Sequence, residues 1–173
     1  MTTSRATSVR PETAYPIWEG RPCTQQDCDW LAPRLTAETK AEIEATSIFP
    51  IDKALALDLR GKRAIADSRR SHQPDALLYW YPNPDGSAGI WVGWTDRLAK
   101  SEHELSFASY LSPIIDNLNG YYPRLIAGVD ARDIRRTALM TNLGFELTET
   151  FPQYGLKDLP FHFFTRIKSQ SHV

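Results

Sequence analysis

Two runs of aromatic and branched residues stand close together in the middle of the chain, ALLYWY at residues 76–81 and GIWVGW at 89–94. Residues of these types favour strands, in which successive side chains point to opposite faces of a sheet. The segment between the runs contains Asn83-Pro84-Asp85-Gly86, which fits a type I turn with proline in its second position and glycine in its fourth. The pattern predicts a β-hairpin.

Four other segments also have the composition of strands. We expect PRLIAGV to lie beside the second hairpin strand, and the last two segments to form a closing antiparallel pair. The four segments are YPIWEG at 15–20, PRLIAGV at 123–129, FELTETF at 145–151 and FHFFTRI at 161–167.

Three helices are predicted before the hairpin. Thr24 stands at an N-cap position with Asp27 three residues later, an imperfect capping box before a helix through Leu31. Thr36 opens the segment AETKAEIEA, whose apolar stripe is thin, so we expect this helix to lie on the surface. Asp52 is expected to cap a longer helix over residues 53–70, although its first part, ALALDL, also alternates like a strand.

Two helices are predicted after the hairpin. The apolar spacing from Glu102 to Leu118 is helical, and Pro113 within it should kink or split the helix because proline lacks a backbone donor. The segment ARDIRRTALMTNL should form a helix that stops at Gly144, a residue that adopts the left-handed conformation without strain.

The composition fits one soluble globular domain. The chain has 173 residues, of which 42% are hydrophobic, and a formal net charge of -1. We expect a flexible N-terminal arm at residues 1–14, a single domain at 15–167 and a C-terminal tail at 168–173. No apolar run is long enough for a membrane span and no secretory signal stands at the N-terminus, so we expect synthesis in the cytoplasm.

The charge and the cysteines bear on possible partners. A nearly neutral chain has no overall field for nucleic acid, and the Arg69-Arg70 and Arg135-Arg136 doublets alone favour such a role. Cys23 and Cys28 have no second cysteine pair or histidine cluster nearby, so no metal site is predicted. We interpret them as reduced thiols, with Cys28 pointing inward.

The last third of the chain resembles the closing half of the GNAT acetyltransferases. The resemblance rests on the order strand, helix and two strands, and on Val129, Leu139, Leu143, Gly144 and Phe145. It implies an α+β fold with a mixed, mostly antiparallel sheet flanked by helices. It also implies acetyl-CoA as the cofactor, and Trp94, Thr95, Asp133 and Arg136 are the residues expected to contact acyl-CoA if it binds.

Three departures from the family's pattern stand at functional positions. The segment TDRLAKSEHE at 95–104 has no glycine where the family binds phosphate on backbone amides. Met140 replaces the tyrosine that protonates the thiolate, and Asp133 replaces an asparagine. We therefore assign no catalytic residue, although a base could come from the group Glu102, His103, Glu104 and His162.

Nearly the whole chain resembles a phage family related to the internal virion protein A of short-tailed phages. The shared segments are LAPRL at 31–35, AEIEA at 41–45, W-x-x-W-T-D at 91–96, YPRL at 122–125, VDAR at 129–132, Gly155 and LPFHF at 159–163. The resemblance implies a virion-associated structural or assembly protein, an internal, tail or head-tail component. It would be made in the host cytoplasm and bind other virion proteins in multiple copies.

The hairpin carries aromatic rings on both faces, which adds a candidate contact surface. Trp80 and Trp94 are the residues we expect to bind a partner. The alternative function is an active acetyl-CoA-dependent N-acyltransferase that modifies a protein.

Overall fold

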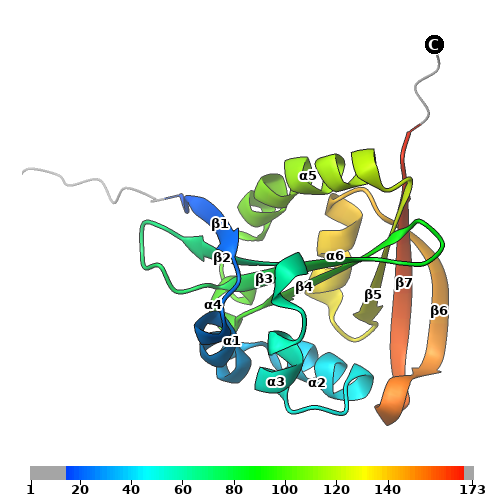
Figure 1. Ribbon diagram of the computed structural model, residues 1–173, viewed down its shortest axis with the longest axis horizontal. Coiled ribbons are helices and arrows are strands. Elements are labelled where there is room, and N and C mark those ends of the chain that lie inside the picture. The colour runs from blue at the N-terminus through cyan, green and yellow to red at the C-terminus, as the bar shows by residue number, and fades with distance from the viewer. Residues whose placement is uncertain (1–14, 170–173) are drawn as a thin grey trace, which may run out of the picture.

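One seven-stranded sheet forms the centre of the protein (Figure 1). The structure is a computed structural model and describes residues 15–169. The strand order is β1-β2-β3-β4-β5-β7-β6, and every neighbouring pair is antiparallel except β4 and β5. The bounds are β1 Trp18–Pro22, β2 Lys62–Asp67, β3 Ala76–Pro82, β4 Ala88–Trp94, β5 Arg124–Asp130, β6 Glu146–Tyr154 and β7 Leu159–Ile167. The predicted mixed, mostly antiparallel sheet is confirmed.

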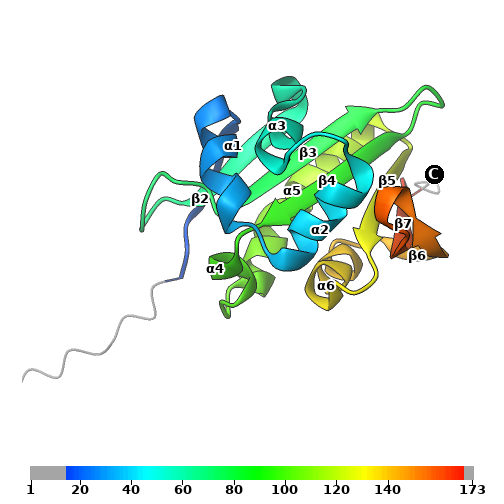
Figure 2. The same ribbon diagram turned by 90° about the horizontal axis from the view of Figure 1, so that it is seen from below.

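Helices cover both faces of this sheet (Figures 1 and 2). On one face lie α1 Gln25–Leu31, α2 Ala37–Thr46 and α3 Ile51–Ala56. On the other face lie α5 Glu104–Tyr121 and α6 Ile134–Asn142, and the short α4 Asp96–Ala99 follows β4. Three single 3₁₀ turns complete the set: η1 Ala32–Arg34, η2 Leu59–Gly61 and η3 Gly155–Lys157.

Local signals set several of these elements as predicted. Thr24 caps α1 in a full capping box with Asp27, and Thr36 caps α2. The hairpin of β3 and β4 forms around the predicted turn, in which the Gly86 amide donates to the Asn83 carbonyl at 3.1 Å. The chain reverses after α6 at Gly144, whose φ is 81°.

The prediction of one helix over residues 53–70 is wrong. Only Ile51–Ala56 is helical; the chain then turns at Asp58, which has a φ of 45°, and Lys62–Asp67 forms β2. β2 pairs with β1 on one side and, over Lys62 to Ile65, with β3 on the other, so it lies inside the sheet. Pairing with distant strands overrode the local helical pattern.

Two further expectations about helices need correction. α5 continues to Tyr121 across Pro113, so the proline does not split it. α2 is not a surface helix, because Thr39, Glu42, Ile43 and Ala45 on it are buried. The apolar stripe of α2 looks thin in the sequence because one of its inward-facing residues, Glu42, is charged.

The larger core lies between the sheet and the pair α5 and α6. Phe107, Leu111 and Ile115 of α5 are fully buried against the inward side chains of β3, β4 and β5. Met140 of α6 is 1% exposed within the same cluster. Its position is that of a core side chain, as expected.

Replacing Met140 should therefore destabilise the protein. We expect Met140→Ala to lower the free energy of unfolding by about 2–5 kcal/mol, because the shortened side chain leaves a cavity in a packed core. Urea unfolding followed by circular dichroism measures the change. Ile134→Ala is the matched control on the same helix, since Ile134 is 78% exposed, and should change little. Equal unfolding midpoints for the two variants would contradict the assignment.

Candidate functional site

The two parallel central strands, β4 and β5, stay together for only a short distance. They pair at Ala88 with Leu125 and at Gly89 with Ile126, and beyond these residues the ladder ends. The sheet therefore has an opening at the carboxyl ends of β4 and β5. The Val92 carbonyl and the Asp130 amide face this opening without a strand partner from the ladder. Unpaired backbone groups inside a protein require other partners.

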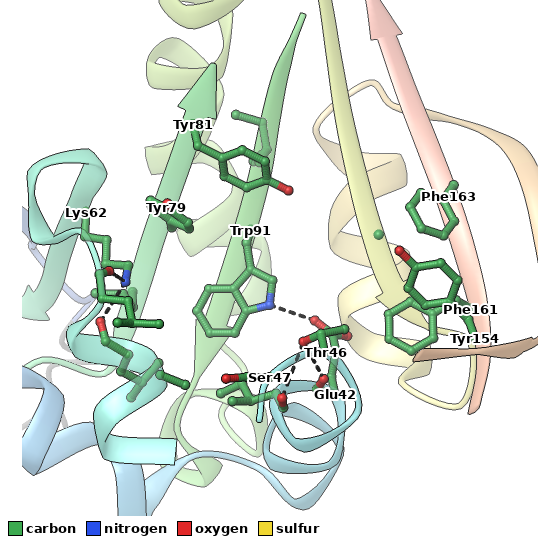
Figure 3. A pocket seen from close by; sticks show the side chains of 17 residues that line it. Glu42, Thr46, Ser47, Lys62, Tyr79, Tyr81, Trp91, Tyr154, Phe161 and Phe163 are labelled. Carbon is green, nitrogen blue, oxygen red and sulfur yellow. Dashed lines mark hydrogen bonds between the residues drawn. The ribbon is translucent and has the colours of Figure 1, made fainter. Parts of the chain in front are cut away.

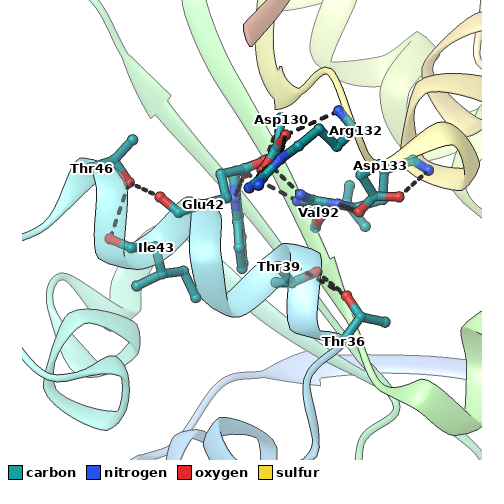
Figure 4. A network of polar contacts seen from close by, with 11 residues as sticks. Thr36, Thr39, Glu42, Ile43, Thr46, Val92, Asp130, Arg132 and Asp133 are labelled. Carbon is teal, nitrogen blue, oxygen red and sulfur yellow. Dashed lines mark hydrogen bonds and ion pairs between the residues drawn. The ribbon is translucent and has the colours of Figure 1, made fainter. Parts of the chain in front are cut away.

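An ion pair fills the opening (Figure 4). Glu42 reaches it from α2 on one face of the sheet and Arg136 from α6 on the other, and the side chains are 2% and 1% exposed. Glu42 accepts from the Asp130 amide at 2.8 Å, and Arg136 donates to the Val92 carbonyl at 3.2 Å. Through these contacts, the pair takes the place of the missing ladder bonds.

Both charged groups of the pair are closely surrounded by partners. Each Glu42 oxygen accepts one bond from the guanidinium of Arg136, and Oε1 also accepts from the indole of Trp91 at 2.7 Å. Arg136 Nε donates to Asp133 at 2.6 Å. Burial alone would lower the pKa of Arg136, but the two carboxylates outweigh it and raise the pKa. Glu42 has two donors on each oxygen, so its capacity to accept hydrogen bonds is filled.

A second acid lies at the end of β5. Asp130 is 0% exposed and accepts from the backbone amide and the guanidinium of Arg132. Burial alone would raise the pKa of Asp130, but these bonds lower it below its ordinary value. Asp130 is therefore a structural anion rather than a proton donor near neutral pH.

Next to the ion pair lies a cavity of about 420 Å³ (Figure 3). Its first wall consists of Tyr81 of β3 and Trp91 of β4. These rings lie flat on the sheet because β4 has glycine beneath them: a methyl group at Gly89 would collide with the Tyr81 ring, and one at Gly93 with the Trp91 ring. We call this cavity the aromatic cleft.

The opposite wall comes from the last two strands. Tyr154, Phe161 and Phe163 pack against one another with ring centroids 4.9 to 6.4 Å apart. Gly128 of β5 lies between the two walls, and a methyl group there would meet the Phe163 ring at 3.1 Å. The cleft is thus a slot with ring faces on both sides and no side chain on the intervening glycine.

The charged groups of the cleft are already occupied. Lys62 donates to the carbonyls of Leu55 and Leu57, and its ammonium lies 4.6 Å from the centre of the Tyr79 ring. Burial lowers the pKa of Lys62. Glu42 is held by the ion pair. The cleft therefore offers a ligand ring faces, aliphatic surface and hydroxyl groups rather than a free charge.

The loop after β4 uses its own backbone donors. The amides of Ala99, Lys100 and Ser101 donate to carbonyls of the preceding turn. At the start of α5, where a helix attracts anions, Glu104 supplies a carboxylate that pairs with Arg135 at 3.1 Å. The first turn of α5 has no side-chain cap, and the loop before it contains no glycine.

The residues predicted to contact acyl-CoA are in structural positions. Trp94 is 1% exposed in the core, and its role in binding a partner stays a prediction. Thr95 caps α4 and donates to Asp75 at 3.1 Å, while Asp133 and Arg136 belong to the ion network. Trp80 is half-buried against the core that α5 covers, and its role in binding stays a prediction.

The candidate bases are scattered rather than gathered at the cleft. Glu104 pairs with Arg135, and His162 shares a hydrogen bond with Thr150 at 3.0 Å. His103 is half-buried at the start of α5, and Glu102 precedes it on the exposed loop. Sequence reasoning missed Glu42. The signal was present, because a glutamate stood on the apolar side of a helix whose stripe was thin.

Metal-binding clusters and membrane-spanning helices are both absent from the described residues. Residues 15–169 contain no group of three or more histidine, cysteine, aspartate or glutamate side chains that could hold a metal ion. No helix in this part of the chain has the length and apolar character needed to cross a membrane.

Comparisons with known proteins give the fold. No protein-family model matches the chain, and no curated protein matches it. Among solved structures, ribosomal-protein-alanine N-acetyltransferase from Brucella melitensis is 22% identical with a TM-score of 0.61, covering 87% of this chain and 99% of that one. Ribosomal-protein-S5-alanine acetyltransferase from Vibrio fischeri is 10% identical with a TM-score of 0.62, covering 92% and 96%. A GCN5-related N-acetyltransferase from Kribbella flavida is 14% identical with a TM-score of 0.62, covering 87% and 98%. The chain has a GNAT-like fold.

The residues of this chain do not fit the acyl-CoA that such a fold implies. The opening between β4 and β5 is crossed by Glu42 and Arg136. In the loop after β4, the amides of Ala99, Lys100 and Ser101 donate to carbonyls of the preceding turn, and Glu104 puts negative charge at the start of α5, where a pyrophosphate would need a positive field. Met140 is buried and has no proton to donate.

The ion pair should contribute to stability as a unit. We expect Arg136→Met alone to lower the free energy of unfolding by about 3–5 kcal/mol, because it leaves Glu42 buried without its partner. The double variant Glu42→Leu with Arg136→Met should cost clearly less than the sum of the single variants. Denaturant unfolding of all four proteins measures the coupling.

The matched control is Arg135→Met, next to Arg136 on the same helix. Arg135 is half exposed and its pair with Glu104 should be worth at most about 1 kcal/mol. If the loss of unfolding free energy in the double variant equals the sum of the losses in the two single variants, Glu42 and Arg136 are not coupled.

Stability should also fall in acid. The pKa values of Asp27 and Asp130 are lowered in the folded protein, so their stabilising effect is complete above the unfolded value of about 4 and is lost as the pH falls through the folded values. Asp130→Asn should destabilise the protein at pH 7 and flatten this acid dependence. Asp29→Asn, on the exposed side of α1, should leave the dependence unchanged. Melting temperatures from pH 2 to 7 test this, and parallel curves for Asp130→Asn and the unmodified protein would disprove it.

Proposed function

We propose that this chain is a non-catalytic binding protein with a GNAT-like fold, and that it works as an assembled component of a phage particle. The observation that carries the first part is the buried pair of Glu42 and Arg136 in the opening between β4 and β5. It fills the gap between these two strands, and four hydrogen bonds already occupy the two oxygens of Glu42. The aromatic cleft beside it remains accessible to a ligand.

The lining of the cleft suits an apolar side chain of a partner protein. Ring faces on both walls bind aromatic or aliphatic groups, the charge of Glu42 is paired with Arg136, and Lys62 donates to backbone carbonyls. Burial, and then the nearby Tyr154 phenol, raise the pKa of Tyr81, so the Tyr81 hydroxyl keeps its proton and can donate. A backbone carbonyl beside the bound side chain would accept from such a hydroxyl.

The rim of the cleft extends this apolar surface. Several large apolar residues around it are exposed by 38% to 82%, and apolar groups of this size exposed together are typical of protein interfaces. Leu57, Tyr81 and Tyr154 line the cleft and Phe151 packs against Tyr154, while Ile48, Phe49 and Leu156 closely follow lining residues in the chain. A partner that places one side chain in the cleft would also cover this rim.

The phage assignment rests on the near full-length sequence resemblance described above. It implies other virion proteins as the partners, several copies in one particle and synthesis in the host cytoplasm. The polar arm at residues 1–14, which lies outside the described residues, is proposed as a second contact.

An acyl-CoA-dependent N-acyltransferase is the second candidate. It is favoured by the likeness in fold to solved acetyltransferases. To act in this way, the chain would have to break the pair of Glu42 and Arg136 and find a base other than Glu42. An acetyl-transfer assay on the purified protein, with peptide amines as acceptors, distinguishes the two candidates.

Incorporation into particles tests the proposed function. We expect mass spectrometry of purified virions to detect the chain, and Gly128→Val to reduce its incorporation at least about ten-fold, which corresponds to roughly 1.4 kcal/mol of lost contact. A β-carbon at Gly128 meets the Phe163 ring at 3.1 Å, so the valine side chain would take up space between the walls of the cleft.

Gly120→Ala is the control, because a methyl group at Gly120 on α5 meets no atom within 4 Å. It should incorporate like the unmodified chain. Virions that contain no copy of the chain would exclude the phage role, and unchanged incorporation of folded Gly128→Val would exclude the cleft as the contact.

A further inference from the structure

The chain has two cysteines, and they lie side by side. Cys23 directly follows β1, and Cys28 lies in α1; their sulfur atoms are 3.7 Å apart. Cys23 is 7% exposed and Cys28 is 0% exposed. Both are free thiols in the structure.

Several bonds fix the backbone on which these two thiols stand. The Cys23 amide donates to the Lys62 carbonyl at 3.1 Å, and the Cys28 amide to the Thr24 carbonyl at 3.2 Å. Between them, Thr24 and Asp27 form the capping box of α1, and Arg21 anchors Asp27. The closeness of the sulfurs is thus a property of a rigid cap rather than of loose side chains.

The groups around the two thiols favour a reaction between the sulfur atoms, because they shift the pKa values of both cysteines. The hydrogen bond between the thiols raises the pKa of Cys23 and lowers that of Cys28, and the ammonium of Lys62 lowers the pKa of Cys28 further against the effect of burial. Thiolate character is what makes a cysteine reactive.

We propose that Cys23 and Cys28 form a reversible dithiol–disulfide site whose oxidant is a small peroxide. Hydrogen peroxide transfers one oxygen to a thiol, which becomes a sulfenic acid as water leaves. The second sulfur then displaces the hydroxyl group from the first, a sulfur–sulfur bond forms, and a second water leaves. Two thiols and one peroxide thus give one disulfide and two waters.

Closing the bond needs only a local movement. The sulfurs must approach from 3.7 Å to about 2.0 Å, which rotation of the two short side chains can accomplish where they already touch. The second step is intramolecular, so disulfide formation should be faster than further oxidation of the sulfenic acid by peroxide. The link would tie the first turn of α1 to the end of β1 without adding a charge to the surrounding apolar cluster.

Peroxide treatment of the folded, full-length protein at low concentration tests the site. We expect both thiols to disappear together, the protein to stay monomeric, and peptide mass spectrometry to find residues 23 and 28 linked with the loss of two hydrogen atoms. Dithiothreitol should restore both thiols. Because the chain has no other cysteine, a thiol titration reports on this pair alone.

Cys23→Ser and Cys28→Ser are matched controls, and neither should form an internal link. The peroxide experiment on the unmodified protein tests the proposal even if one of the serine variants folds poorly. Thiols that stay free under peroxide, that oxidise separately to sulfinic acids, or that link only between molecules would each overturn the proposal.

Discussion

The ion pair between Glu42 and Arg136 is the interaction on which the rest of the site depends. Two charges are buried where the central strands separate, a costly arrangement unless nearly every polar atom has a partner. The partners come from both faces and both strands: the Trp91 indole, the Asp130 amide, the Val92 carbonyl and the Asp133 carboxylate. The pair therefore fixes α2 and α6 against the sheet and closes its opening.

This closure determines what the aromatic cleft can do. Glu42 is bonded to Arg136, and Lys62 is bonded to two carbonyls. What remains are ring surfaces laid flat over glycines. The proposed binding of an apolar group rests on this lining, in keeping with the principle that sites rather than folds decide function.

Elements that form through interactions between neighbouring residues could be predicted from the sequence. The hairpin of β3 and β4, the cap at Thr24 and the stop at Gly144 each depend on a few neighbouring residues. The failure at residues 53–70 has the opposite cause, since β2 exists because β1 and β3 pair with it. Glu42 and Arg136 are 94 positions apart in the chain, so their contact could not be predicted from a single sequence. The sequence showed only a glutamate among the apolar positions of α2.

A crystal structure grown with acetyl-CoA in millimolar excess tests the central claim most directly, because it shows which atoms occupy the opening between β4 and β5. We predict that Arg136 remains bonded to Glu42 and to the Val92 carbonyl, with no pantetheine between the strands. A structure in which these side chains have separated, with the thioester lying between β4 and β5, would contradict the account and make acyl transfer the leading function.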